Sequence, residues 1–111
     1  MNDTISPYKA LDFIRDNAEA YAIAKASVSY LTEFRKTIKA ILMQQSDAKT
    51  ESAKESYAYS HEDYVNNLVA LRTAIELAES MRWKLIAAQS KIAVWQTLEA
   101  SSRFETKKAN I

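Results

Sequence analysis

The segment Arg82–Gln96 has the sequence RWKLIAAQSKIAVWQ, in which apolar side chains lie on more than one side of any helix that it forms. On a helical wheel that starts at Met81 and advances about 100° per residue, four apolar side chains fall within about 40° of it. They are Leu85, Ala88, Ile92 and Trp95. Their alternating spacing of four and three residues is typical of one seam of a coiled coil. The segment is therefore predicted to pack lengthwise against a second helix.

A second apolar face lies on the far side of the same wheel. One explanation is that the N-terminal helix folds over this face within a single chain. The other is that a second copy of the protein covers it, because an exposed apolar face usually marks an interaction site. We predict self-association, and the wheel leaves open which of the two seams faces the second copy. The candidate interface residues are Trp83, Ile86, Val94, Trp95 and Leu98.

The absence of glycine predicts the fold class. The 111-residue chain contains no glycine and a single proline, Pro7, whereas hairpins, barrels, sandwiches and α/β folds need many turn residues. An all-α fold remains. Residues 61–103 contain neither glycine nor proline, which predicts one helix of about 43 residues and roughly 65 Å. Because residues 7–45 have nearly the same length, we predict a long antiparallel helical hairpin that assembles into a dimer or a higher helical bundle.

Polar residues mark the predicted helix ends near the N-terminus. Ser6 followed by Pro7 is a favourable helix start, which predicts a short N-terminal helix over residues 7–16. Asp16 and Glu19 have the spacing of a capping box, so a second helix is predicted over residues 17–45. The alternative is one continuous helix through this point. Along the second helix, the predicted packing face contains Ile23, Leu31, Phe34, Ile38, Ile41 and Leu42.

The second half of the chain carries similar signals. Residues 46–60 form the predicted turn, of which the part from Ala53 onward can form a short helical piece. Ser60 stands three residues before Asp63, which suits the N-terminus of the helix over residues 61–103. The tail over residues 105–111 is predicted to fray. The whole chain, residues 1–111, is predicted to be a single helical domain.

Catalytic signatures are missing from this sequence. Without glycine the chain has no phosphate-binding loop, nucleophile elbow or dinucleotide fingerprint, and without cysteine it has no thiolate zinc site. The single histidine, His61, lies in HEDY, which lacks the two-histidine spacing of zinc enzymes. We therefore predict a protein that is not an enzyme and that has no metal, cofactor or small-molecule substrate. Its apolar runs are about five residues at most, so no signal-peptide core or membrane contact is expected.

Basic residues suggest a binding surface even though the formal net charge is only +1. Arg35, Lys36 and Lys39 are predicted to lie together on the outer side of their helix. Residues 82–108 contain more basic than acidic residues, which can follow a nucleic-acid backbone. The simpler interpretation is that these lysines and arginines solvate an exposed helix. The basic residues of the second region are Arg82, Lys84, Lys91, Arg103, Lys107 and Lys108.

Tyrosines gather in the segment YAYSHEDY, residues 57–64. Nucleic-acid bases can stack on Tyr57, Tyr59 and Tyr64. Packing that closes the end of the hairpin is the better explanation.

Three segments carry a family resemblance: YLTEFRK at residues 30–36, SYAYSHEDY at residues 56–64, and RWKLIAAQSKIAVWQTLEASSR at residues 82–103. Through them the chain resembles a family of small, mostly uncharacterised tailed-bacteriophage proteins encoded near recombination and single-strand-binding genes. The resemblance implies a phage origin, the cytoplasm of the infected bacterial host, and action around DNA recombination or replication.

Two functions are consistent with these features. In the first, the protein is a non-enzymatic phage accessory of DNA recombination or replication that binds DNA or a host or phage recombination protein. In the second, it is a structural or assembly protein, a self-associating helical scaffold without affinity for DNA. Gene neighbourhood is an association only, so the residues themselves must distinguish the two.

Overall fold

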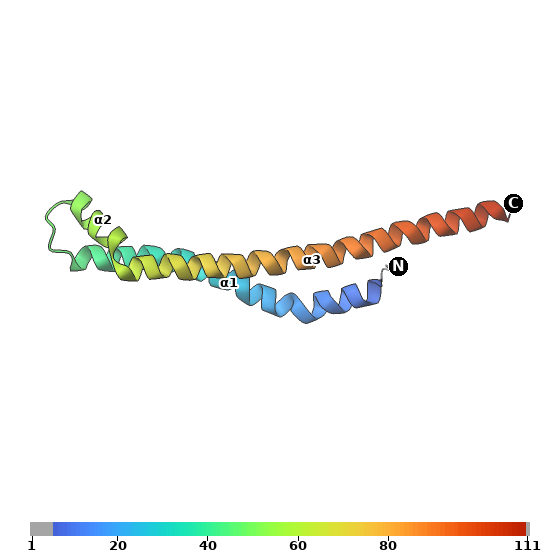
Figure 1. Ribbon diagram of the computed structural model, residues 1–111, viewed down its shortest axis with the longest axis horizontal. Coiled ribbons are helices and arrows are strands. Elements are labelled where there is room, and N and C mark those ends of the chain that lie inside the picture. The colour runs from blue at the N-terminus through green and yellow to red at the C-terminus, as the bar shows by residue number, and fades with distance from the viewer. Residues whose placement is uncertain (1–5, 111) are drawn as a thin grey trace. The chain divides into compact units, whose positions relative to one another are not determined.

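The computed structural model describes residues 6–110 and consists of three helices. These are α1, Pro7–Gln45, α2, Glu51–Ser60, and α3, Glu62–Ala109 (Figure 1). The described residues include no strand and no residue with a positive φ angle, as the absence of glycine predicts. The all-α fold with a long helix pair is therefore confirmed, whereas assembly into a dimer or higher bundle stays a prediction.

Contacts divide the chain into two compact units. The loop unit is residues 21–79, which comprise the C-terminal half of α1, all of α2 and the beginning of α3. The terminal unit is residues 1–20 together with 80–111, which comprise the beginning of α1 and the rest of α3. Each unit is described separately below, and the single domain stays a prediction.

The core of the loop unit lies where its three helical segments meet. Leu42 of α1 is 2% exposed, Ala58 of α2 is 0% exposed and Tyr64 of α3 is 8% exposed. Ile38 and Met43 of α1 pack against this cluster. Because α2 supplies a fully buried residue, it is an integral part of the core and not merely a connection.

The covered residues of the loop unit follow a heptad pattern on both long helices. Their spacing alternates between three and four residues, as in a coiled coil. On α1 the residues with this spacing are Tyr21, Ala24, Val28, Leu31, Arg35, Ile38 and Leu42, and Thr32, Lys39 and Met43 beside them are also half-buried. On α3 they are Tyr64, Asn67, Leu71, Ala74 and Ala78.

The predicted packing face of residues 20–45 is therefore only partly correct. Leu31, Ile38 and Leu42 are covered, but Ile23 is 61% and Ile41 is 46% exposed. The covered seam is rotated by roughly 70° about the helix axis from the most apolar face. The seam uses small residues, which allow two helices to approach closely, in place of some larger apolar ones.

In the terminal unit, the predicted seam of α3 is confirmed. Ala88 is 6% exposed, and Met81, Leu85, Ile92 and Trp95 are half-buried. The covered residues of α1 in this unit repeat the same spacing, and they are Pro7, Ala10, Ile14 and Asn17. Trp95 therefore belongs to a seam that the chain covers itself.

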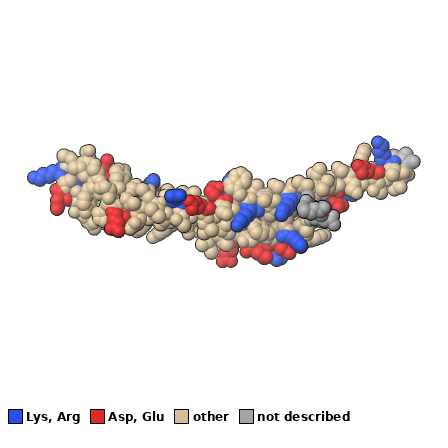
Figure 2. All heavy atoms as spheres, viewed as in Figure 1, with Lys and Arg blue, Asp and Glu red and all other residues tan. Residues whose placement is uncertain are grey.

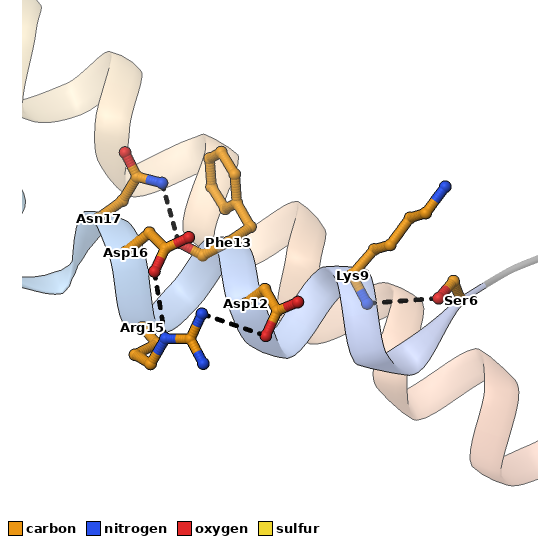
Figure 3. A network of polar contacts seen from close by, with 7 residues as sticks. All are labelled: Ser6, Lys9, Asp12, Phe13, Arg15, Asp16 and Asn17. Atoms are coloured by element: carbon orange, nitrogen blue, oxygen red, sulfur yellow. Dashed lines mark hydrogen bonds and ion pairs between the residues drawn. The ribbon is translucent and has the colours of Figure 1, made fainter.

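The predicted helix boundary at residues 16 and 17 is wrong, because α1 continues through it. Asp16 accepts a hydrogen bond from Nε of Arg15 at 3.1 Å, so its carboxylate binds a side chain (Figure 3). Asn17 donates from Nδ2 to the carbonyl oxygen of Phe13 at 2.8 Å, a bond within the helix (Figure 3). The predicted start is confirmed, since the Ser6 hydroxyl accepts from the backbone N–H of Lys9 at 3.3 Å.

The short helical piece expected within residues 46–60 is present as α2, which begins at Glu51 and not at Ala53. The hydroxyl of Thr50 accepts a hydrogen bond from the N–H of Ala53 at 3.1 Å and caps this helix. The cap predicted at Ser60 lies one residue later: Nδ1 of His61 accepts from the N–H of Asp63 at 3.0 Å. Accordingly α3 begins at Glu62 rather than at residue 61.

The tail predicted to fray is largely helical, because α3 continues to Ala109. The N–H of Asn110 still donates to the carbonyl oxygen of Thr106 at 3.2 Å. Lys107 and Lys108 occupy the last turn, where positive charge interacts favourably with the helix dipole. Ile111, the last residue of the predicted tail, lies outside the described residues.

Candidate functional site

The tyrosines of the loop unit close its end by packing. The rings of Tyr59 and Tyr64 meet edge to face with centroids 5.2 Å apart, and Tyr57 lies beside His61 at 5.6 Å. Tyr64 is 8% exposed and has no free face for a base, whereas Tyr57 and Tyr59 are 39% and 45% exposed. Packing therefore accounts for the buried member, and base stacking on the other two stays a prediction.

Lys39 is held by this aromatic cluster. Its ammonium lies 4.8 Å from the centroid of the Tyr59 ring and 3.7 Å from a carboxylate oxygen of Glu55. A side-chain hydrogen bond with Tyr59, supported by the negative charge of Glu55, raises the pKa of Lys39 above its usual value. Lys39 thus ties α1 to α2 instead of projecting toward a ligand.

The three basic residues predicted to lie together on the outer side of α1 differ in position. Arg35 occupies the covered seam and is half-buried. Lys39 lies beside the seam and is also half-buried. Lys36 alone is exposed, and its ammonium lies 3.4 Å from a carboxylate oxygen of Glu33. The three residues therefore differ in burial, with Lys36 exposed and the other two half-buried, and binding through them stays a prediction.

The basic residues of α3 lie on two separate edges of the helix. At about 100° per residue, Arg82 and Arg103 share one edge, and Lys84 and Lys91 lie roughly 160° from Arg82 on the other. All four are exposed, and the guanidinium of Arg82 lies 5.1 Å from the Trp83 ring centroid. Positive and negative side chains also alternate over the visible face (Figure 2). No single basic stripe follows from this arrangement.

The candidate interface residues separate into two groups. Trp83, Val94 and Leu98 are 60%, 46% and 57% exposed. Ile86 and Trp95 are half-buried, and Trp95 belongs to the covered seam. Trp83 and Val94 lie on the side of α3 that faces away from that seam, whereas Leu98 follows Lys91 by one heptad and lies on the edge with Lys84 and Lys91.

This outward face of α3 is free of charge over residues 83–104. In each heptad of α3, three positions lie on the side opposite the covered seam. Between residues 83 and 104, none of these positions holds an acidic or basic residue. The outward positions of residues 65–80, in contrast, include Arg72, Glu76 and Glu79. Six residues of this face are spaced alternately by three and four positions, and we call them the outward stripe. They are Trp83, Ile86, Ser90, Ala93, Thr97 and Ala100. Phe104, which is 66% exposed, continues the same spacing.

A second uncovered apolar surface lies on α1 within the loop unit. An open groove is lined by Ile23, Ala26, Ser27, Tyr30 and Leu31. Tyr30 and Phe34 stack beside it with centroids 5.5 Å apart. These residues belong to the face that was predicted to pack but that the hairpin leaves exposed.

Over residues 6–110, no three histidine, cysteine, aspartate or glutamate side chains are grouped so that they could hold a metal ion. None of the described helices is long and apolar enough to cross a membrane. The imidazole of His61 stabilises the fold, because its Nδ1 caps the N-terminus of α3.

No protein-family model, curated protein or solved structure matches this chain.

Proposed function

We propose that this protein is a non-enzymatic helical scaffold that binds protein surfaces, first of all a second copy of itself. The observation that supports the proposal best is the uncharged outward face of α3 over residues 83–104. Solvent-facing helix positions normally carry charged side chains. Here Trp83 and Val94 are instead 60% and 46% exposed. Exposed apolar surface of this extent favours an interface.

The biological setting of the proposal rests on the resemblance to phage proteins. We infer that the chain serves a tailed phage in the cytoplasm of the infected bacterial host, as an accessory of DNA recombination or replication. The partner that fits the helical surfaces is a host or phage recombination protein. Lys39 contacts Tyr59 and Glu55 of α2, and Arg35 is half-buried, which favours a protein partner over direct contact with DNA.

A test of self-association compares two exposed aromatic residues. In sedimentation velocity over a concentration series, we expect the wild type to form dimers or larger species. Trp83→Glu places a charge in the outward face and should weaken association by at least about tenfold, or 1.4 kcal/mol. Tyr8→Glu is the matched control, because Tyr8 is 74% exposed and lies on α1. A wild type that is monomeric at every concentration would refute self-association.

Direct DNA binding is the second candidate, and the exposed cations of α3 favour it. Lys84, Lys91 and Arg103 are exposed and form no ion pair with any residue between 6 and 110. Phosphate contacts lose affinity steeply with salt. If DNA is bound, the fluorescence anisotropy of labelled DNA should show binding at about 50 mM salt that weakens strongly at about 200 mM. The absence of binding at low salt would exclude this candidate.

A further inference from the structure

The outward stripe has bulky residues at its ends and small residues in its middle. Trp83 and Ile86 stand at one end and Phe104 at the other. Between them the stripe contains only alanine, serine and threonine, over a total length of about 31 Å at 1.5 Å per residue. A surface with this profile fits a partner helix that has small residues opposite its bulky ones, because close packing leaves no voids.

We propose that two copies of this protein pair antiparallel through their outward stripes. In this pairing Trp83 lies opposite Ala100 of the second copy, Ile86 opposite its Thr97, and Ser90 opposite its Ala93. Phe104 then lies opposite Glu79 of the second copy, one turn from its Trp83, and packs on the aliphatic part of that side chain. The inference rests on the proposed function, since it specifies the surface and the orientation of self-association.

Antiparallel pairing is the arrangement that matches large with small residues. A parallel pair in register would place Trp83 against Trp83, and Phe104 against Phe104. These rings would hold the helices apart over the small middle residues and leave a void there, which is unfavourable. In the antiparallel pair the alanine and serine positions allow the helix axes to approach to about 8 Å.

The exposed aromatic rings supply part of the area that a stable contact needs. Trp83 and Phe104 are 60% and 66% exposed. A covered aromatic side chain buries about 150–250 Å², so the four in a dimer bury roughly 500 Å² of exposed surface. Specific interfaces bury about 1,200–2,000 Å² in total, so the proposed pairing requires the outward positions between the rings to bury at least about 700 Å² more. Because the pairing has two-fold symmetry, every contact occurs twice.

The pairing also covers a part of α3 whose residues are exposed in the described chain. Residues 96–110 are all exposed. An isolated helix of about 12–15 residues is only marginally stable in water, because most helical stability in proteins comes from packing. A second copy along the outward stripe supplies this packing as far as Phe104.

Single-cysteine variants test the orientation, since the chain contains no cysteine of its own. Ala93→Cys and Ala100→Cys introduce the same change at two exposed positions of the stripe. In the antiparallel pair, the two copies of position 93 lie within one turn of each other, whereas the two copies of position 100 are separated by roughly 26 Å along the axis. With a short bismaleimide cross-linker, we expect a covalent dimer from Ala93→Cys and almost none from Ala100→Cys.

The other outcomes are distinguishable by sedimentation of the same samples. Equal cross-linking at both positions would indicate a parallel pair and overturn the inference. Dimers in sedimentation without cross-linking at either position would also overturn it, because another face would then be the interface, while self-association itself would stand. Monomers at all concentrations would refute both the inference and the proposed function. Circular dichroism of each variant checks that the helices are retained.

Discussion

Replacing Asn67 by leucine should stabilise the protein. Asn67 occupies the covered seam of α3 in the loop unit and is 7% exposed. Its side-chain oxygen Oδ1 is buried and has no hydrogen-bond partner among the described residues. An acceptor in this state has lost its hydration without gaining a protein partner, which is unfavourable for folding. Leucine has a similar shape and no polar atom, so it removes this penalty.

The size of the effect follows from the burial. An unsatisfied buried polar group costs about 1–3 kcal/mol, and Asn67→Leu should raise the free energy of unfolding by about that amount. Asn66→Leu is the matched control, because its side chain is adjacent but exposed. A surface substitution of this kind changes the free energy of unfolding by no more than about 0.5 kcal/mol.

Urea unfolding followed by circular dichroism measures both variants. With a slope of about 2 kcal/mol/M, Asn67→Leu should raise the urea midpoint by roughly 0.5–1.5 M, and Asn66→Leu should shift it by at most about 0.3 M. The protein concentration must be the same in every sample, because association stabilises the folded state.

A lower midpoint for Asn67→Leu would refute this reasoning, because it would show that Oδ1 has a favourable partner such as a buried water molecule. Equal shifts for the two variants would refute it as well. In that case the gain would come from leucine's higher helix propensity, which acts at both positions, and not from removal of a buried acceptor.

Two further predictions concern the core and the aromatic cluster. Leu42→Ala should lower the free energy of unfolding by about 2–5 kcal/mol, because Leu42 is 2% exposed. The same change at Leu77, which is 56% exposed, should cost less than about 1 kcal/mol in urea unfolding, and equal losses would contradict the assigned core. The raised pKa of Lys39 contributes stability that is fully present below the usual lysine pKa of about 10.4 and is lost as the pH rises through the raised value. As the pH rises above about 10.4 the wild type should therefore lose more stability than Lys39→Met, and parallel losses would show that the contact with Tyr59 is unimportant.

The predictions from sequence that were confirmed depend on local properties. The absence of glycine predicts an all-α chain because few other residues adopt the backbone conformations that tight turns require. Ser6 was identified as the start of α1 because its hydroxyl is within reach of the nearby N–H of Lys9. The seam from Met81 to Trp95 was found by its spacing alone, since every covered position recurs after three or four residues.

Local signals were weaker where two interpretations of the same residues competed. Asp16 has the spacing of a capping residue, but its carboxylate binds Arg15 and the helix continues. Ser60 was a better cap by composition than His61, yet Nδ1 of His61 accepts the hydrogen bond from Asp63. In each case the position of the helix end depended on a side chain that capping-box spacing does not take into account.

The tertiary structure alone determined which face of α1 is covered over residues 21–45. In residues 21–45 the covered seam includes Ala24 and Arg35 and leaves Ile23 exposed, although a helical wheel ranks isoleucine as the better core residue. The physical reason is that packing depends on the shape of the opposing helix and on how closely two backbones approach, which no single segment specifies. The same reason explains why Lys39, predicted on the outer side, is held by Tyr59 and Glu55 of α2.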